Sequence, residues 1–203
     1  RVYPQKADFT FYGGIYRDVY MLIVEETHFD LDFCGGSGFL VTPKLNGADA
    51  ELVLEAYIKG EAEKVVVTVS DREGTELAAV ELAKTDGKYT GRYSIKDARR
   101  WNGRKDPYLY QAAAAVYADG KKSDEVSVRF GCREYSFDPE KGFFLNGESY
   151  PLHGVSRHQD RLGVGNALTK EMQEEDMELI LSVGANSIRL AHYQHDQYFY
   201  DLC

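Results

Sequence analysis

Hydrophobic and polar residues alternate most regularly in the middle of the chain, between residues 39 and 137. A period of two residues is typical of β-strands, because successive side chains point to opposite faces. The apolar positions that recur in this way are Leu52, Leu54, Ala56 and Ile58 in one run and Val65, Val67 and Val69 in the next. We expect them to face the core of an all-β domain.

Turn signals separate these runs at intervals of about 8 to 12 residues. Asp86-Gly87 and Asp119-Gly120 fit tight hairpin turns, because both residue types tolerate a positive φ. About seven short strands within roughly 100 residues are typical of an immunoglobulin-like β-sandwich. We place this domain at residues 31–137, and the fold class expected for the chain is mainly β.

The pattern changes after residue 138. A hairpin with an Asn146-Gly147 turn is followed by one amphipathic helix and then by a short buried strand at residues 185–191. Strand, helix and strand in this order predict the first βα units of a TIM-type barrel, which we place at residues 138–203. Since such a barrel has eight units, we expect it to be incomplete here, with exposed apolar strand edges.

The first helix of this region is expected over residues 170–183. Thr169 is a good N-cap, and Gly184 suits the C′ position because glycine readily adopts the left-handed conformation. Its predicted apolar stripe consists of Met172, Leu179, Ile180 and Val183. A second helix is expected over residues 196–203, and a chain that ends inside a helix favours a truncated polypeptide.

The first 30 residues are less regular and dense in aromatic side chains. Gly13-Gly14 interrupt them before an expected strand at residues 15–24. We interpret residues 1–30 as the end of a preceding domain whose other strands are absent. The segment is therefore expected to be partly unpaired or docked on the sandwich.

Composition narrows the possible partners. The 203 residues carry a formal net charge of −9, which disfavours sequence-independent nucleic-acid binding because such binding needs clustered cations. No apolar run approaches the roughly 18 residues of a membrane span, so we expect a soluble protein that binds neither nucleic acid nor membrane. Cys34, Cys132 and Cys203 are too few and scattered for a disulfide framework, and are expected to be free and buried.

Candidate chemistry lies near the C-terminus. His158 and His192 each follow a predicted strand, and in a parallel barrel both loops emerge at the face where substrates bind. Arg189 lies within the second strand, where an inward guanidinium usually orients an anion. The residues alone equally allow structural histidines and an outward-facing Arg189, so both interpretations stay open.

Two further interpretations are weaker. A metal site could use His153 with His158, or His192 with His195, but neither spacing is that of a helical zinc pair. Acidic residues in an aromatic setting, such as Asp8, suit sugar binding. Surface carboxylates are common, however, so the pattern alone leaves Asp8 as a solvated residue.

Three groups of motifs, in order along the chain, resemble one family. Residues 143–158, with Arg157-His158, and residues 184–193 resemble the start of the catalytic barrel of glycoside hydrolase family 2. Residues 13–19 resemble the end of its sugar-binding jelly-roll domain. Residues 101–110 resemble a strand of its immunoglobulin-like domain. The resemblance covers the whole chain, and within the family Arg157-His158 is most similar to the β-galactosidases.

The resemblance implies roles for individual residues. His158 and His192 would contact sugar hydroxyls, and Arg189 would orient the nucleophilic carboxylate. Asp8 would reach the sugar site from the jelly roll and ligate sodium. Sodium and magnesium would be metals of the parent enzyme, and no cofactor is expected for this part of it.

The resemblance also implies the reaction. Two glutamates, a nucleophile and an acid/base, would cleave terminal β-D-galactosides with retention, and both would lie on later barrel strands. The chain is therefore expected to hold no catalytic residue and to be inactive alone. The alternatives are a β-glucuronidase, a β-mannosidase or a non-catalytic module that binds a glycan or a partner protein. A homo-oligomer is allowed, and the compartment stays open between cytoplasm and periplasm.

Overall fold

The computed structural model describes residues 12–203. Asp8 lies outside the described residues. The chain divides into two compact units, one formed by residues 22–150 and one formed by residues 151–203 together with the N-terminal residues up to Met21. Each unit is considered by itself.

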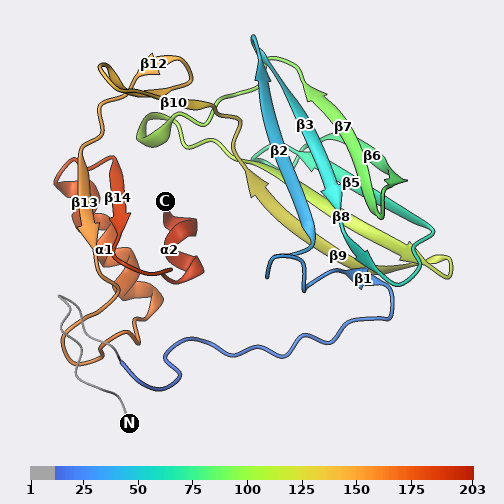
Figure 1. Cartoon of the computed structure of the whole chain (residues 1–203), viewed down its shortest axis with the longest axis horizontal. Helices are drawn as coiled ribbons and strands as arrows, with labels where there is room; N and C mark the ends of the chain where they lie inside the picture. The colour runs from blue at the N-terminus through green and yellow to red at the C-terminus, as the bar shows by residue number, and fades with distance from the viewer. Residues whose placement is uncertain (1–11) are drawn as a thin grey trace. The chain divides into compact units, whose positions relative to one another are not determined.

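Residues 22–150 are built around a seven-stranded antiparallel sheet with the order β2-β3-β7-β6-β5-β8-β9 (Figure 1). Its strands are β2 (Phe39–Asn46), β3 (Asp49–Ala56), β5 (Lys64–Ser70), β6 (Glu76–Thr85), β7 (Lys88–Ile95), β8 (Tyr110–Ala118) and β9 (Lys121–Phe130). Strand β6 changes partner along its length. Residues 76–82 pair with β5 and residues 83–85 pair with β7, so the sheet bends at β6 and continues on both sides of it.

The core of this unit follows the alternation in the sequence. Every second residue of β3 and of β5 is buried, and β8 follows the same alternation except that Ala115 is buried as well. The predicted core positions Leu52, Leu54, Ala56, Val65, Val67 and Val69 are all fully buried. Ile58 is half-buried and belongs to a separate strand, β4 (Ile58–Lys59), which pairs with β1 (His28–Phe29).

The predicted hairpin turns are also present. Asp86 and Gly87 have φ values of 49° and 78°, and Asp119 and Gly120 have 50° and 70°. Consecutive positive φ angles are what a tight two-residue hairpin requires. The turn residues therefore fix the connections β6–β7 and β8–β9.

A three-stranded sheet follows the main sheet within the same unit. It consists of β10 (Tyr135–Asp138), β11 (Gly142–Leu145) and β12 (Glu148–Ser149). Asn146 and Gly147, with φ of 53° and 81°, form the predicted turn between β11 and β12. A short 3₁₀ helix, η1 (Gly103–Lys105), lies in the loop that follows Trp101.

The second unit contains the predicted βαβ arrangement. β13 (Gly154–Arg157) and β14 (Ser187–Leu190) form a parallel pair, connected through α1 (Lys170–Ser182). The Thr169 side chain accepts a hydrogen bond from the Met172 backbone, and Gly184 has a φ of 79°, so both predicted ends of α1 are confirmed. α2 (Gln197–Leu202) follows, with Asp196 as its N-cap.

The predicted apolar stripe of α1 is partly wrong. The buried side chains are Gln173 and Met177, which lie one turn apart on the helix. Leu179 is 60% exposed and Val183 is 71% exposed. The structure therefore buries one line of side chains on α1 in place of the predicted stripe.

The N-terminal part of the described chain shows no helix or strand before β1. The predicted strand at residues 15–24 is therefore not formed, and Ile15 and Ile23 are 84% and 90% exposed. An extended segment becomes a strand only when a neighbour completes its hydrogen bonds. Of the two expected states, an unpaired segment and a docked one, the absence of a strand agrees with the first.

The three cysteines are free, but only Cys132 is buried. Burial raises the pKa of the Cys132 thiol to about 11, because a thiolate is poorly solvated there. The expectation of burial is wrong for Cys34 and Cys203, which are exposed. Neither helix of residues 12–203 is long and apolar enough to cross a membrane.

Candidate functional site

The two parallel strands of the second unit deliver two histidines to the same edge. β13 and β14 pair in register, with Arg157 opposite Leu190. His158 directly follows β13, and His192 lies two residues after β14. Their ring centroids are 5.3 Å apart and the rings are nearly perpendicular. The structure thus brings the two predicted sugar-binding histidines together.

The two faces of this strand pair differ in chemistry. Ser156 and Arg189 are opposite each other in register and are both exposed. Val155 and Arg157 point to the other face, where Arg157 contacts α1. In a TIM barrel, the face away from the helices lines the interior. The sequence left open which face Arg189 takes, and the structure puts its side chain on the face away from α1.

Arg189 is bound to one of the two histidines. A terminal guanidinium nitrogen lies 3.0 Å from Nδ1 of His192. Because guanidinium is only a donor, Nδ1 must accept this bond, which leaves the proton of the neutral ring on Nε2. The Nε2–H of His192 is then a hydrogen-bond donor in a fixed direction.

Arg157 is buried, with only 5% of its surface exposed. Its Nε and one terminal nitrogen donate to the same Asp176 oxygen at 2.9 and 2.7 Å, and the other terminal nitrogen lies 2.9 Å from Nδ1 of His195. The guanidinium carbon lies 3.8 Å from the centre of the Phe199 ring. Arg157 therefore ties β13 to α1 and α2, and its side chain does not face the exposed side of the strands.

His195 is the second buried member of this cluster. Burial, the largest cause, lowers the pKa of its imidazole, and the nearby Arg157 charge lowers it further. Its Nε2 lies 3.4 Å from the Ala191 carbonyl oxygen. Since Nδ1 must accept from Arg157, the ring is neutral and Nε2 carries the proton. A partner for His195 so far along the chain was not apparent from the sequence.

Gln159, on the other side of His158, is also buried. Its side-chain oxygen accepts a bond from the Asp196 backbone at 2.5 Å, and its backbone N–H donates to the Tyr193 hydroxyl at 3.2 Å. Burial raises the pKa of Tyr193. The loops after β13 and β14 are therefore joined on both sides of His158.

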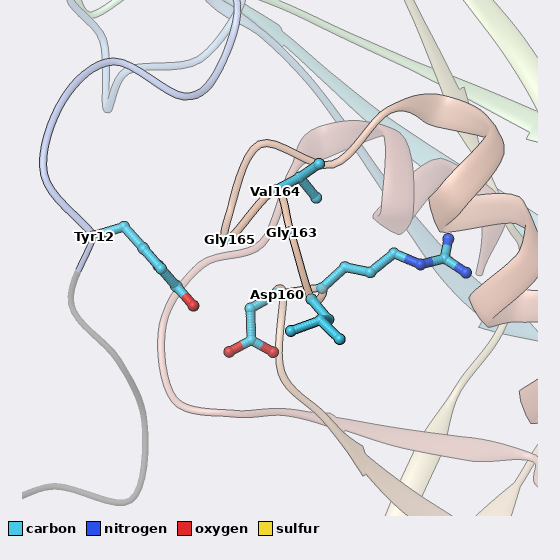
Figure 2. A pocket seen from close by; sticks show the side chains of 7 residues that line it. Tyr12, Asp160, Gly163, Val164 and Gly165 are labelled. Carbon is cyan, nitrogen blue, oxygen red and sulfur yellow. The ribbon is translucent and has the colours of Figure 1, made fainter.

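A shallow cavity of about 610 Å³ lies beside these loops (Figure 2). It is lined by Tyr12 and by residues 160–165. Arg161 and Gly165 exchange two backbone hydrogen bonds of 2.9 and 3.0 Å, which close this loop. Gly165 has a φ of 60°, and a Cβ there would lie 2.8 Å from the Tyr12 ring, so only glycine fits.

The remaining predicted site residues are placed as follows. The His153 backbone N–H donates to the Asn186 side chain at 2.7 Å. No cluster of three or more potential metal ligands of the His, Cys, Asp or Glu type occurs within the described residues. Asp8, the candidate sodium ligand and sugar-binding residue, lies outside them. The roles of His158, His192 and Arg189 stay predictions.

Comparisons with known proteins match two regions of the chain. A family model described as "Glycosyl hydrolases family 2" matches residues 37–133, and one described as "Glycosyl hydrolases family 2, TIM barrel domain" matches residues 139–203. The predicted fold class is confirmed: the chain is mainly β, with an immunoglobulin-like sandwich and the first part of a TIM barrel.

Individual relatives are enzymes of this kind. A β-glucuronidase of Bacteroides fragilis is 39% identical over 99% of the chain. The crystal structure of an FMN-binding β-glucuronidase from Facaelibacterium prausnitzii L2-6 is 40% identical over 99% of the chain, with a TM-score of 0.88. A β-galactosidase of Thermoanaerobacter pseudethanolicus is 27% identical over 97%. The chain spans 30%, 31% and 26% of these proteins, respectively.

Proposed function

Since the chain belongs to the glycosyl hydrolases of family 2, we propose that it supplies the first strands and part of the sugar-binding edge of a β-glucuronidase. The observation that carries this proposal is the similarity to two β-glucuronidases, at 39% and 40% identity over 99% of the chain. The β-galactosidase compared above is 27% identical. The proposed substrates are terminal β-D-glucuronides.

The geometry of the histidine pair supports sugar binding at this edge. The Nε2–H of His192, held by Arg189 at Nδ1, is a fixed donor suited to a sugar hydroxyl. His158 lies beside it with its ring nearly perpendicular. Two hydroxyls on one sugar ring could be bound by such a pair, and bonds to hydroxyls that strengthen in the transition state contribute several kcal/mol to glycoside hydrolysis.

The bond cleavage itself would come from two carboxyl groups. In a retaining glycosidase these lie about 5 to 5.5 Å apart, one acting as nucleophile and the other as acid and then base. Glu171, Glu174, Glu175 and Glu178 lie on α1 and are exposed, so we assign none of them to this role. Arg189 would orient the nucleophile, and Asp8 would contact the sugar from the N-terminal side.

A β-galactosidase is the second candidate. It is supported by the 27% identical relative and by the resemblance of Arg157-His158 to that subgroup. The burial of Arg157 weakens the second argument, because its guanidinium is bound to Asp176 and His195. The presence of an arginine at this position is therefore explained by packing against α1, and it does not indicate which sugar is bound.

Hydrolysis of two matched substrates tests the proposal. We expect the full-length protein to release p-nitrophenol from p-nitrophenyl β-D-glucuronide with a kcat/KM at least tenfold above that for the β-D-galactoside. The reverse order would establish the galactosidase. Hydrolysis of neither, with saturable binding of sugar, would leave a glycan-binding module instead.

A pair of histidine variants tests the site. His158→Ala is expected to lower kcat/KM by roughly 10²-fold, since misplacing a substrate by about 1 Å has an effect of that size. His28→Ala is the matched control, because His28 is bonded to the Glu25 carbonyl in the other unit. Equal activity of the two variants would remove His158 from the site.

The metals and partners are part of the same proposal. We propose that Asp8 ligates sodium beside the sugar and that magnesium and homo-oligomerisation belong to the whole enzyme. Activity measured with sodium or potassium as the sole monovalent cation tests the first point. Equal KM values in the two salts would contradict it.

A further inference from the structure

The buried cation Arg157 is the least expected feature of the second unit. Charged side chains are almost never fully buried unless they are paired. Arg157 meets this requirement through Asp176 on α1 and His195 in the loop before α2, with Phe199 of α2 under its guanidinium. One side chain thus contacts both helices of the unit from the end of β13.

Stability alone does not require this arrangement. Replacing a buried ion pair by well-packed apolar residues is often neutral or stabilising, since desolvation offsets the attraction. The guanidinium instead fixes the directions of its hydrogen bonds, because its donors form a rigid planar fork. Three bonds to two partners fix the orientation of Asp176 and His195 relative to β13.

The fixed orientation is passed on to the loop that carries His192. His195 Nε2 lies 3.4 Å from the carbonyl oxygen of Ala191, and the Ala191 N–H donates to the Arg157 carbonyl at 2.9 Å. Ala191 is the residue immediately before His192. Arg157 is therefore connected to Ala191 in two ways. One is the bond between the two backbones, and the other runs through the His195 ring.

The same network fixes His158 from both sides. Arg157 precedes it, and Gln159 follows it with bonds to the Asp196 backbone and the Tyr193 hydroxyl. Both neighbours are buried while His158 is half-buried. With Arg157 and Gln159 bonded in this way, the His158 side chain lies on the side of the His192 ring.

We propose that Arg157 and His195 are positioning residues that hold His158 and His192 in their ring-to-ring arrangement. The inference rests on the proposed function for the claim that these two histidines bind sugar. Neither positioning residue would touch the substrate, because Arg157 and His195 are both buried. Arg157 and His195 would act by fixing the position and orientation of the His158 and His192 rings.

The test compares two substitutions of His195 in the full-length protein. His195→Asn keeps an acceptor for Arg157 at the place of Nδ1, and is expected to retain kcat/KM within about threefold. His195→Leu has a similar size but no acceptor, and is expected to lower kcat/KM by about 10- to 100-fold, as a shift of the order of 1 Å would. The loss should fall mainly on KM if ground-state sugar contacts are displaced.

Arg157→Met is the second variant, because methionine retains an apolar stem over Phe199 without the fork. The same 10- to 100-fold loss is expected. Arg99→Gln is the matched control. Arg99 also binds one aspartate, Asp106, with Nε and a terminal nitrogen and lies 4.4 Å from the Tyr108 ring, but in the other unit. Its kcat/KM should equal that of the unchanged protein.

A readout independent of activity separates positioning from folding. With ¹⁵N-labelled histidine, the signals of His158 and His192 should shift in His195→Leu and Arg157→Met and stay in place in His195→Asn and Arg99→Gln. Unshifted signals and unchanged kcat/KM in the first two variants would overturn the inference. If the unchanged protein hydrolyses neither glycoside, the proposed function fails, and the ¹⁵N signals still decide whether the network positions the rings.

Discussion

The two units of the chain bury different kinds of side chain. In residues 22–150 the interior is formed by alternate residues of β3, β5 and β8, and Thr27 is the one buried polar residue there among those described. In the unit that contains β13, β14 and α1, five polar residues are buried: Arg157, Gln159, Asn166, Gln173 and His195. Its buried apolar residues are Met177, Ala185, Ala191 and Phe199.

The two kinds of buried side chain have different effects: apolar ones stabilise the fold, and polar ones fix the positions of their partners. Apolar burial is non-directional and stabilises in proportion to the area removed from water. Buried polar groups contribute little net stability, but they determine where each partner stands. Asn166 Oδ1 and Gln173 Oε1 have no hydrogen-bond partner within the described part of the chain, and each such group costs about 1–3 kcal/mol. The interior of residues 22–150 is thus mainly apolar, whereas the interior of the βαβ unit is rich in buried polar groups.

The largest effect is expected from a cavity in the sandwich. Leu54→Ala removes a fully buried side chain of β3 and should lower the free energy of unfolding by about 2–5 kcal/mol. Urea unfolding followed by Trp101 fluorescence measures it, because Trp101 is the sole tryptophan of the 203 residues. Hydrogen exchange in β13 and β14 should be unchanged, and faster exchange there would show that the units are not independent.

A smaller loss of stability is expected when the buried Arg157 loses its carboxylate partner. Asp176→Asn leaves Arg157 buried without a carboxylate and should destabilise the βαβ unit by about 2–3 kcal/mol, since bonds to charged groups contribute about 1.5–3 kcal/mol. Faster hydrogen exchange in α1, β13 and β14 is the measurement. Glu175→Gln is the control one residue away: its ion pair with Arg161 is exposed, so its effect should stay below about 1 kcal/mol. Similar effects of the two variants would contradict the difference drawn between buried and exposed charge.

Removal of the N-cap of α1 should have a still smaller effect on stability. Thr169→Ala removes the acceptor for the Met172 N–H and should destabilise α1 by about 1 kcal/mol. Exchange of the first-turn amides should rise, while Thr169→Ser should behave like the unchanged chain because serine caps equally well. A serine variant as labile as the alanine variant would show that the methyl group, and not the cap, matters.

The mildest test is a change of pH. The pKa of His195 is lowered from 6.5, chiefly by burial, so the unfolded chain binds a proton more readily than the folded one. Stability of the βαβ unit should therefore be fully present above pH 6.5 and decrease as pH falls below it towards the folded pKa. His195→Asn should remove this part of the dependence in the range below pH 6.5. Identical exchange profiles of the two proteins over this interval would exclude His195 as its source.

The period of two residues identified the sandwich core because a strand must alternate whatever it packs against. The Asp-Gly and Asn-Gly turns were predictable for a similar local reason, as were the N-cap Thr169 and Gly184 after α1. The helical period could not identify the buried line of α1. Leu179 and Val183 are apolar but exposed, because the face of a helix that becomes covered depends on its neighbours in space and not on the helix alone.

The sequence by itself determined the mainly β fold class, the βαβ order and the family, since these depend on local pattern and motif. It also indicated His158 and His192 as neighbours, because parallel strands end at one edge. Only the tertiary structure decided that Arg157 turns towards α1 and that His195 and Gln159 join the two loops. These contacts link residues about 20 to 40 positions apart through side-chain geometry, which leaves no periodic trace in the sequence.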